Sequence, residues 1–279
     1  MFDIIGWLGT ASILLGYYLN ARKLDTSWIV WFLGNLFMLI YSIKINASPQ
    51  VSTALLLHLI EKKYEIHTIS YFYGQKNKSE LDGLARILHY LEYEGYNITN
   101  QRIDLSSVFG SFNSSLTSSD VDVPTGKTDE SKMKMNFVPN RNAIFSSVLY
   151  GFAVSLTKEQ DTEVDLCLGV HGGDGNVIPP DCTAEFHEKL EDAFKIGNIN
   201  TDRINYYLPY VDKKKYNIIE DAYFVCKSLN LNFRFIFGNS ISCYNGNGCG
   251  ECGACKDRIK AFDKAGINDV TKYLGDVNE

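Results

Sequence analysis

The chain has 279 residues, a formal net charge of −6 at pH 7 and a sequence pI near 5.4. This length suits about two domains of ordinary size. The acidic balance lacks the basic surplus of proteins that grip RNA or DNA, so we expect no direct nucleic-acid binding. The seven cysteines include three scattered ones without a pairing pattern, which argues against a disulfide-stapled fold and favours a reducing compartment.

Residues 1–48 are almost free of charge. Only five of them are charged, and the runs 4–20 and 26–43 carry no charge. Each run approaches the roughly 20 apolar residues that a transmembrane helix needs, and aromatic residues gather near the run ends as they do at membrane interfaces. We therefore predict two or three hydrophobic, transmembrane helices in this region. The alternative is a helical hairpin buried in a soluble protein.

The charges also predict an orientation in the membrane. Arg22 and Lys23 lie between the two runs, and the positive-inside rule puts that turn in the cytoplasm. The uncharged stretch 45–60 is a candidate third span that would return the chain to the cytoplasm. We therefore expect a cytoplasmic domain anchored in the cytoplasmic membrane through its N-terminus. No basic residue precedes the first run, so a cleaved signal peptide is not expected.

From residue 64 onward the pattern alternates between strands and helices. Strands are predicted at 64–73, 98–105 and 164–170, and helices at 79–93, 142–154, 183–196 and 217–229. This alternation predicts a mostly parallel α/β sheet with ligands at the carboxyl ends of its strands. The stretch 110–132 is dense in Ser, Thr, Asp and Gly, and a loop of that length is usually disordered or a lid over a site.

Four cysteines form the strongest motif of the chain. Cys243, Cys249, Cys252 and Cys255 are interleaved with glycines that allow the turns around a tetrahedral ion. Four thiolates leave no open position for water, so segment 242–258 predicts a structural zinc site, with an iron–sulfur cluster as the alternative. The remaining cysteines, Cys167, Cys182 and Cys226, are expected to be small core residues.

Several short pieces together resemble a known family. They are Ser52-Thr-Ala-Leu-Leu-Leu, Tyr73-Gly74-Gln75, Val138-Pro-Asn-Arg141-Asn142, Pro180-Asp181-Cys182 with Glu185-Phe186, Leu208-Pro209 with Asp212, and Ser242-Cys-Tyr-Asn-Gly through Ala261-Phe262. Over about residues 52–266, their order and spacing resemble the 7-cyano-7-deazaguanine synthase family of PP-loop ATP pyrophosphatases. The resemblance implies an α/β PP-loop domain, of the adenine nucleotide alpha hydrolase-like kind, that includes the zinc knuckle. Residues 267–279 would be a C-terminal tail.

The resemblance also implies an activity in queuosine and 7-deazapurine biosynthesis. The reaction is ATP-dependent conversion of 7-carboxy-7-deazaguanine and ammonia to the nitrile, through an adenylated carboxylate and an amide. ATP with Mg²⁺ is the co-substrate, and zinc is structural. No catalytic residue is assigned. The residues expected to bind ATP or substrate are Ser52, Tyr73, Gly74, Gln75, Arg141, Asn142, Asp174, Asp181 and Cys182.

The candidate residues also have simpler interpretations. Arg141 could hold a carboxylate or phosphate with its guanidinium fork, or pair with a surface acid. Asp174 follows a predicted strand in a glycine-flanked turn, which suits a base, ribose or magnesium contact, or a turn cap. Cys182 could be plain packing.

One motif departs from the family pattern. The family's ATP loop reads Ser-Gly-Gly-x-Asp-Ser, whereas this chain has Ala-Ser-Pro-Gln-Val-Ser at 47–52. Both glycines are missing and Pro49 lacks an N–H donor, so we expect a poor phosphate cradle. The membrane-like segment would also replace the family's first strand. Two readings follow: a ligase whose phosphate site is built unusually or completed by a second copy in a homodimer, or a catalytically inactive membrane-tethered module that binds a deazapurine or nucleotide.

Overall fold

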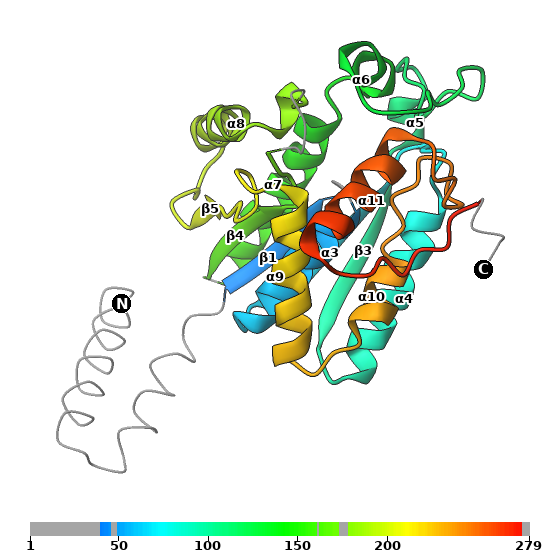
Figure 1. Ribbon diagram of the computed structural model, residues 1–279. Helices are drawn as coiled ribbons and strands as arrows, with labels where there is room; N and C mark the ends of the chain where they lie inside the picture. Colours follow the sequence, from blue (N-terminus) through cyan, green and yellow to red (C-terminus); the bar gives the residue numbers. More distant parts are fainter. Residues whose placement is uncertain (1–39, 46–48, 161, 173–177, 275–279) are drawn as a thin grey trace, which may run out of the picture.

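Five parallel strands form the centre of the computed structural model, which describes residues 40–45, 49–160, 162–172 and 178–274 (Figure 1). The strands are β1 (Ile40–Ile45), β2 (Glu65–Phe72), β3 (Ile98–Asp104), β4 (Glu163–Leu168) and β5 (Ile204–Tyr206). Their order is β3-β2-β1-β4-β5, and every neighbouring pair is parallel. The predicted parallel α/β fold is confirmed.

The central strand, β1, corrects a prediction. It pairs with β4 along its whole length, from Ile40 opposite Glu163 to Ile45 opposite Leu168. The strand begins inside the apolar run 26–43, so the prediction that a membrane-like segment replaces the first strand is wrong. A central parallel strand is covered on both faces and reads as a continuous apolar run, which sequence alone does not distinguish from a span. The run 4–20 and most of 26–43 lie outside the described residues.

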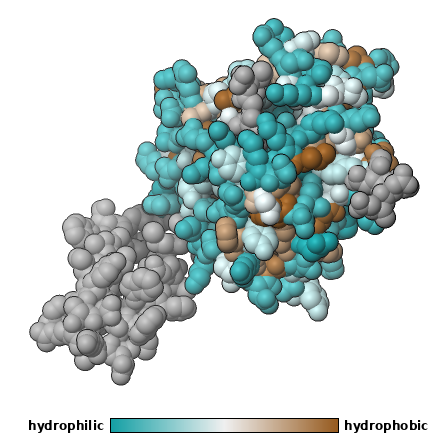
Figure 2. All heavy atoms as spheres, viewed as in Figure 1, coloured by the Kyte–Doolittle hydropathy of each residue, from teal (hydrophilic) through white to brown (hydrophobic). Residues whose placement is uncertain are grey.

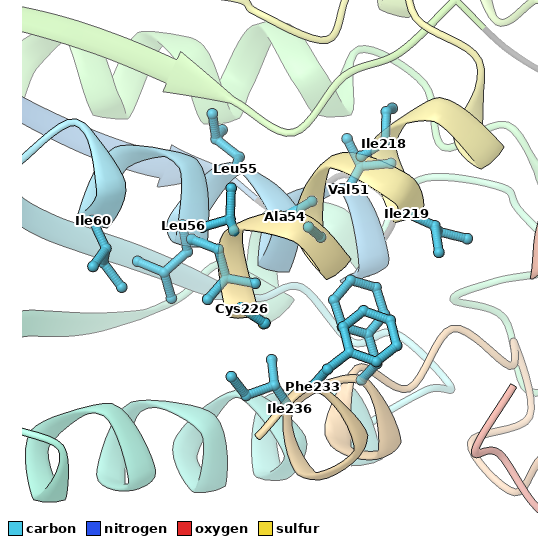
Figure 3. Packing of buried hydrophobic residues seen from close by; sticks show 14 of the residues in the cluster. Val51, Ala54, Leu55, Leu56, Ile60, Ile218, Ile219, Cys226, Phe233 and Ile236 are labelled. Atoms are coloured by element: carbon cyan, nitrogen blue, oxygen red, sulfur yellow. The ribbon is translucent and has the colours of Figure 1, made fainter. Parts of the chain in front are cut away.

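The predicted third span is wrong as well. Residues 45–60 supply the end of β1 and most of helix α3 (Pro49–Glu61), in which 10 of 13 side chains are buried. This helix packs against α9 (Lys215–Ser228) and α10 (Phe233–Asn239), and Figure 3 shows its apolar side chains meeting theirs. A helix surrounded by protein needs no polar face, so it resembles a membrane helix in sequence. Among the described helices, none is long and apolar enough to cross a bilayer.

Helices cover both faces of the sheet (Figure 1). One face carries α3, α9, α10, α4 (Ser79–Tyr93) and α11 (Gly253–Ala265). The other carries α7 (Arg141–Gln160), with α8 (Ala184–Gly197) packed beside it. Alternate residues of β2 enter the two cores: Ile66 faces the first, and Ile69 and Tyr71 face the second. The view in Figure 2 is mainly hydrophilic, as expected for helices that turn their apolar sides inward.

The prediction that the scattered cysteines are core residues is confirmed for two of them. Cys167 and Cys226 are buried in the first of these two cores, between the sheet and α9. Cys182 is only partly buried and lies on a pocket wall. Cys182 therefore borders the pocket and is not only a packing residue.

Several elements differ from the sequence prediction. Helix α4 has the predicted limits, whereas α7 extends to 20 residues. The elements β5, α10 and α11 were missed, as were α5 (Ser106–Phe109), α6 (Glu130–Asn136) and the 3₁₀ turn η1 (Pro180–Cys182). The stretch 110–132 is docked on the cysteine segment: Thr125 bridges Cys252, and the Gly126 N–H donates to the Glu251 carbonyl at 2.7 Å.

The strand order fixes where a ligand would bind. The chain moves outward from β1 to β3 on one side and from β4 to β5 on the other, so β1 and β4 form the topological switch point. In sheets of this kind the ligand crevice lies beyond the carboxyl ends of the strands at that point. Gly169 and the residues that follow β4 occupy this place.

Candidate active site and zinc-binding cluster

A pocket of about 280 Å³ opens at the carboxyl ends of the strands. At the switch point its wall consists of Pro49 at the start of α3, Gly169 and His171 after β4, and Lys215 at the start of α9. The part of the wall around Arg141, called here the end with Arg141, is built by the β2–α4 connection, the start of α7 and the turn η1. Segments from the loop 110–132 and from the cysteine-rich region close the remaining sides. The pocket thus joins segments that are far apart in the chain.

Arg141 and Tyr73 form the centre of the end away from the switch point. The Arg141 guanidinium lies 5.8 Å from the Tyr73 ring centroid, and its Nη1 is 3.4 Å from the phenol oxygen. The Tyr73 ring also makes an edge contact with Phe145 of α7 at 5.5 Å. Burial raises the pKa of Tyr73, so the ring carries a neutral phenol beside the cation. The pair therefore presents a fixed guanidinium fork and an aromatic edge.

Asp181, Cys182 and Asn142 lie on the neighbouring wall. The Asn142 amide donates to the Asp181 carbonyl at 3.1 Å and approaches the Cys182 sulfur at 3.7 Å. Burial raises the pKa of the Asp181 carboxyl, and Arg141 opposes that rise. Burial raises the pKa of Cys182 to about 12, with Asp181 adding to the effect. Cys182 is consequently a thiol at neutral pH, and not a thiolate nucleophile.

Gln75 lies in the pocket wall, and its side-chain amide is hydrogen bonded within the protein. Its amide Nε2 donates to the Tyr71 carbonyl and to Glu80 Oε1, each at 3.1 Å, and its Oε1 accepts from the Tyr73 N–H at 2.8 Å. Both amide hydrogens are therefore used within the protein. Gln75 lines the pocket, but it is fixed as a clamp that shapes the turn after β2.

Two other predicted residues, Ser52 and Gly74, do not line the pocket. Ser52 is 2 % exposed, and its Oγ would lie 2.4 Å from a Cβ added to Gly169. The glycine thus allows α3 to approach the end of β4. Gly74, with φ of +79°, shapes the turn after β2 and is not part of the pocket lining. Asp174 lies outside the described residues.

The sequence did not single out several pocket residues. Glu80 lies at the start of α4, and burial raises the pKa of its carboxyl to about 7. Lys215 is only 6 % exposed, and burial followed by the nearby Lys215 charge lowers the pKa of His171 to about 3. The signal for these residues is burial of a charge, which exists only after folding. The other missed polar residues of the pocket are Asn77, Lys127, Thr128, Asn136, Ser242, Tyr244, Asp257 and Lys260.

The four predicted cysteine ligands meet in space. The Sγ atoms of Cys243, Cys249, Cys252 and Cys255 all lie within 4.8 Å of one another, and those of Cys249 and Cys255 are 4.0 Å apart. Sulfurs bound tetrahedrally at about 2.3 Å from zinc are about 3.8 Å apart, so the donors present fit this ion. An iron–sulfur cluster would have to occupy the space between the sulfurs and would hold them farther apart.

The surrounding backbone stabilises thiolates. The N–H of Cys249 points to Cys243 Sγ and that of Cys252 to Cys249 Sγ, both at 3.4 Å. Cys252 also caps α11, so the positive end of that helix faces the sulfurs. Gly246, with φ of +76°, adopts a turn that glycine favours. Ser242, Tyr244 and Ala254 from the same segment line the pocket, so the cluster supports one pocket wall.

Comparison with known proteins agrees with this architecture. Residues 45–266 match the family model described as queuosine biosynthesis protein QueC. A 7-cyano-7-deazaguanine synthase from Pseudoalteromonas translucida is 32% identical over 216 residues, covering 77% of this chain and 89% of the relative. One from Caldicellulosiruptor bescii is 35% identical over 226 residues, covering 80% and 92%. One from Alteromonas mediterranea is 34% identical over 211 residues, covering 75% and 87%. The chain therefore belongs to the QueC family.

Proposed function

We propose that this chain is a 7-cyano-7-deazaguanine synthase that uses ATP to convert 7-carboxy-7-deazaguanine and ammonia to the nitrile, in queuosine biosynthesis. The relatives carry this name, and the family match spans the whole α/β domain from the end of β1 to the end of α11. These findings give no support to a catalytically inactive binding module.

The observation that carries the proposal is the half-buried guanidinium of Arg141 in a pocket at the carboxyl edge of the sheet. A carboxylate is a poor acyl electrophile, so it must be held and adenylated before ammonia can attack. Arg141 suits the 7-carboxylate because its planar fork can donate two parallel N–H hydrogen bonds, one to each oxygen. Tyr73 beside it offers an aromatic edge to the ring system. In this proposal Asp181, Asn142 and Cys182 complete the same wall.

The opposite end of the pocket suits the phosphates of ATP with Mg²⁺. Lys215 is a buried cation at the first residue of α9, so its charge adds to the positive end of that helix. It lies in the same pocket wall as His171 and Gly169 at the switch point. In P-loop and dinucleotide folds, phosphates bind where helix N-termini face such a crevice.

We further propose that the sequence at 47–52 weakens phosphate binding. Pro49 begins α3 and lines the pocket, but proline has no N–H to offer a phosphate. Val51, at the aspartate position of the family loop, is fully buried against Ile218 and Ile219 (Figure 3). Loss of one preorganised donor commonly lowers a rate by about 10²–10³-fold. The chain should therefore turn over slowly.

The zinc cluster is proposed to be structural. Four sulfur ligands leave no coordination position for substrate, so the bound ion would supply folding stability rather than Lewis-acid chemistry. Through Ser242 and Tyr244, the same segment would keep the pocket wall in place.

The test is AMP and nitrile formation from ATP, ammonium and 7-carboxy-7-deazaguanine, followed by mass spectrometry. We expect slow AMP release that depends on the deazaguanine. The double variant Ser48→Gly with Pro49→Gly restores the glycine pair and one N–H, and should raise the rate by about 10²-fold. Val51→Asp is left out because it would bury a carboxylate in the core.

Two outcomes would contradict the proposal in different ways. Absence of AMP and nitrile from both the natural chain and the glycine variant would refute the ligase function. A natural chain that is already as fast as the glycine variant would refute only the weakened phosphate site.

A further inference from the structure

Tyr244 lies in a tight turn of the cysteine-rich segment. The Gly246 N–H donates to the Cys243 carbonyl at 2.8 Å, so Tyr244 is the second residue of a β-turn. Cys243 is one of the four predicted sulfur ligands, and the Tyr244 N–H hydrogen bonds to the Cys252 sulfur. A Cβ on Gly246 would lie 2.9 Å from Ser79 Oγ, so the turn also packs closely against the start of α4. The backbone that carries the Tyr244 side chain is therefore held on two sides.

The Tyr244 ring is open to the pocket. Among the described residues of the pocket wall, the six-membered aromatic rings are those of Tyr73, Phe137 and Tyr244. Tyr73 is 6 % exposed, and its ring lies 5.6 Å from that of Phe109 and 5.5 Å from that of Phe145. Tyr244 and Phe137 are only half-buried, and within the described part of the chain neither ring contacts another aromatic ring. These two rings can therefore receive a flat ligand.

Tyr244 lies at the end with Arg141. Burial raises the pKa of Tyr244; the charges of Asp257 and Cys252 add to the rise, and that of Arg141 opposes it. Charge interactions weaken with distance, so the effect of Arg141 places its guanidinium near the Tyr244 phenol. The raised pKa also keeps this phenol neutral at physiological pH. A neutral aromatic ring and a guanidinium fork thus border the same part of the pocket.

The base in the proposed reaction matches this pair of groups. It is a flat, fused aromatic bicycle that carries a carboxylate on its five-membered ring. A stacked contact between a heterocyclic base and an aromatic side chain commonly raises affinity roughly tenfold or more. We propose that Tyr244 stacks on the ring system of 7-carboxy-7-deazaguanine while Arg141 holds its carboxylate, and that the zinc-binding turn fixes the position of the Tyr244 ring.

The inference rests on the proposed function, because it assigns a contact to that substrate. It gives the cysteine cluster a second consequence, since the turn that supplies the sulfur of Cys243 also positions a ligand-binding side chain. The adenine of ATP is a flat heterocycle of similar shape, so it is the competing ligand for the same ring. The position of Tyr244 near Arg141, away from Lys215 and Pro49 at the switch point, favours the deazaguanine.

The experiment is calorimetric titration of the zinc-loaded full chain with 7-carboxy-7-deazaguanine, with the nitrile and with Mg²⁺–ATP. Tyr244→Leu should weaken both deazaguanines about tenfold and by the same factor, because both present the same ring system. The affinity for ATP should change less than about twofold. Tyr244→Phe keeps the ring and should bind both deazaguanines within about twofold of the natural chain. Tyr93→Leu, an exposed change on α4, is the matched control.

Phe137→Leu tests the other half-buried ring and should change the affinity for the base less than about twofold. A loss there in place of Tyr244→Leu would assign the stack to Phe137 and overturn the inference. Equal losses in Tyr244→Phe and Tyr244→Leu would assign the contact to the hydroxyl and overturn it as well. So would a loss confined to ATP, or unchanged affinities in Tyr244→Leu.

Zinc content and a thermal melt show whether Tyr244→Leu is still folded. If it is not, a second measurement decides: nuclear Overhauser effects between labelled tyrosine rings and the ring proton of the bound base. We expect such an effect in the natural chain and its loss in Tyr244→Phe, which still binds. Its absence from the natural chain would overturn the stack. A natural chain that binds neither deazaguanine would overturn the proposed function together with the inference.

Discussion

The two ends of the pocket are built in different ways. At the end with Arg141, side chains from β2, α4, α7 and η1 hold one another through aromatic contacts and the Gln75 clamp. At the switch-point end, the wall consists of backbone at Pro49 and Gly169 with the buried cation Lys215. The first end is thus built from side chains and the second largely from backbone, where Pro49 has no N–H to donate.

Because the two ends are built differently, a sequence change can impair binding at one end and leave binding at the other end intact. Base recognition by stacking and hydrogen bonds does not require the phosphate cradle. Transfer of a phosphoryl group does require it, because the developing charge needs donors already in place. In the proposed function, the end with Arg141 would therefore bind the base even where the switch-point end binds phosphate weakly.

A change in the cysteine cluster tests whether bound zinc holds in place the pocket wall that carries Ser242. Cys252→Ser should release the ion and loosen the segment that carries Ser242, because structural zinc contributes on the order of 10 kcal/mol in small modules. Metal analysis and a thermal melt measure the effect, and Cys182→Ser is the control outside the cluster. Purified chain that contains no zinc, with a melt unchanged by Cys252→Ser, would contradict the structural role.

Helix α11 contributes to the same pocket wall, and the ion pair between Arg258 and Asp269 is expected to anchor this helix. Removing the pair tests that expectation. Arg258 is 2 % exposed; its Nε and Nη2 bind the Asp269 carboxylate, and its Nη1 donates to the Ser240 carbonyl. Asp269→Asn should cost about 3 kcal/mol in urea unfolding, because it leaves a buried cation without its partner. A loss below about 1 kcal/mol would show that the pair does not anchor α11.

The same pair predicts an acid limit to stability. Burial opposes ionisation of Asp269, but the hydrogen bonds and charge of Arg258 and the hydrogen bonds from Tyr273 and Thr271 together lower the pKa of this carboxyl. The pair then contributes fully above the unfolded pKa of about 4, and its contribution is lost as pH falls through the lower folded value. The free energy of unfolding of Asp269→Asn should therefore approach that of the natural chain only at acidic pH. A constant difference down to pH 2 would contradict this.

Gly169 tests the switch-point end. A Cβ there would lie 2.4 Å from Ser52 Oγ, so Gly169→Ala should push the start of α3 aside at a cost of roughly 1–3 kcal/mol. AMP formation should fall while the affinity for the base stays the same. Gly197→Ala, where a Cβ would meet nothing within 4 Å, is the matched control. A Gly169→Ala variant as stable as the control would contradict the close packing.

A substitution of Arg141 tests the proposed contact between its guanidinium and the 7-carboxylate of the base. Arg141→Lys keeps the charge but loses the parallel fork, and should weaken 7-carboxy-7-deazaguanine about tenfold. The affinity for the nitrile, which has no carboxylate, should change little. Arg234→Lys, an exposed change on α10, is the control. An equal loss for both ligands would remove Arg141 from the carboxylate contact.

The features that were predicted correctly depend on residues that lie close together in the sequence. The cysteines of the cluster follow a short spacing, and helix α4 shows its apolar face within 15 residues. The places of Tyr73, Arg141 and Asp181 followed from a resemblance spread over the chain. Local pattern thus predicted the cysteine cluster, and family likeness predicted a minority of the residues that line the pocket.

What the sequence did not predict depends on tertiary contact. β1 and α3 were taken for membrane spans because elements covered by protein on all sides have no polar face. The loop 110–132 was expected to be disordered or a lid, but its partner is the segment around Cys252, far along the chain. Glu80 and Lys215 gain their significance from burial alone, which no spacing of residues indicates.

The most direct test of the account is a pair of calorimetric titrations of the zinc-loaded chain, one with 7-carboxy-7-deazaguanine and one with Mg²⁺–ATP. Each is repeated on the double variant Ser48→Gly with Pro49→Gly. We expect saturable binding of the base, with the same affinity in both proteins, and ATP binding that strengthens only in the variant. Failure of the natural chain to bind the base, or a change in base affinity as large as the change for ATP, would contradict the separation of the two ends.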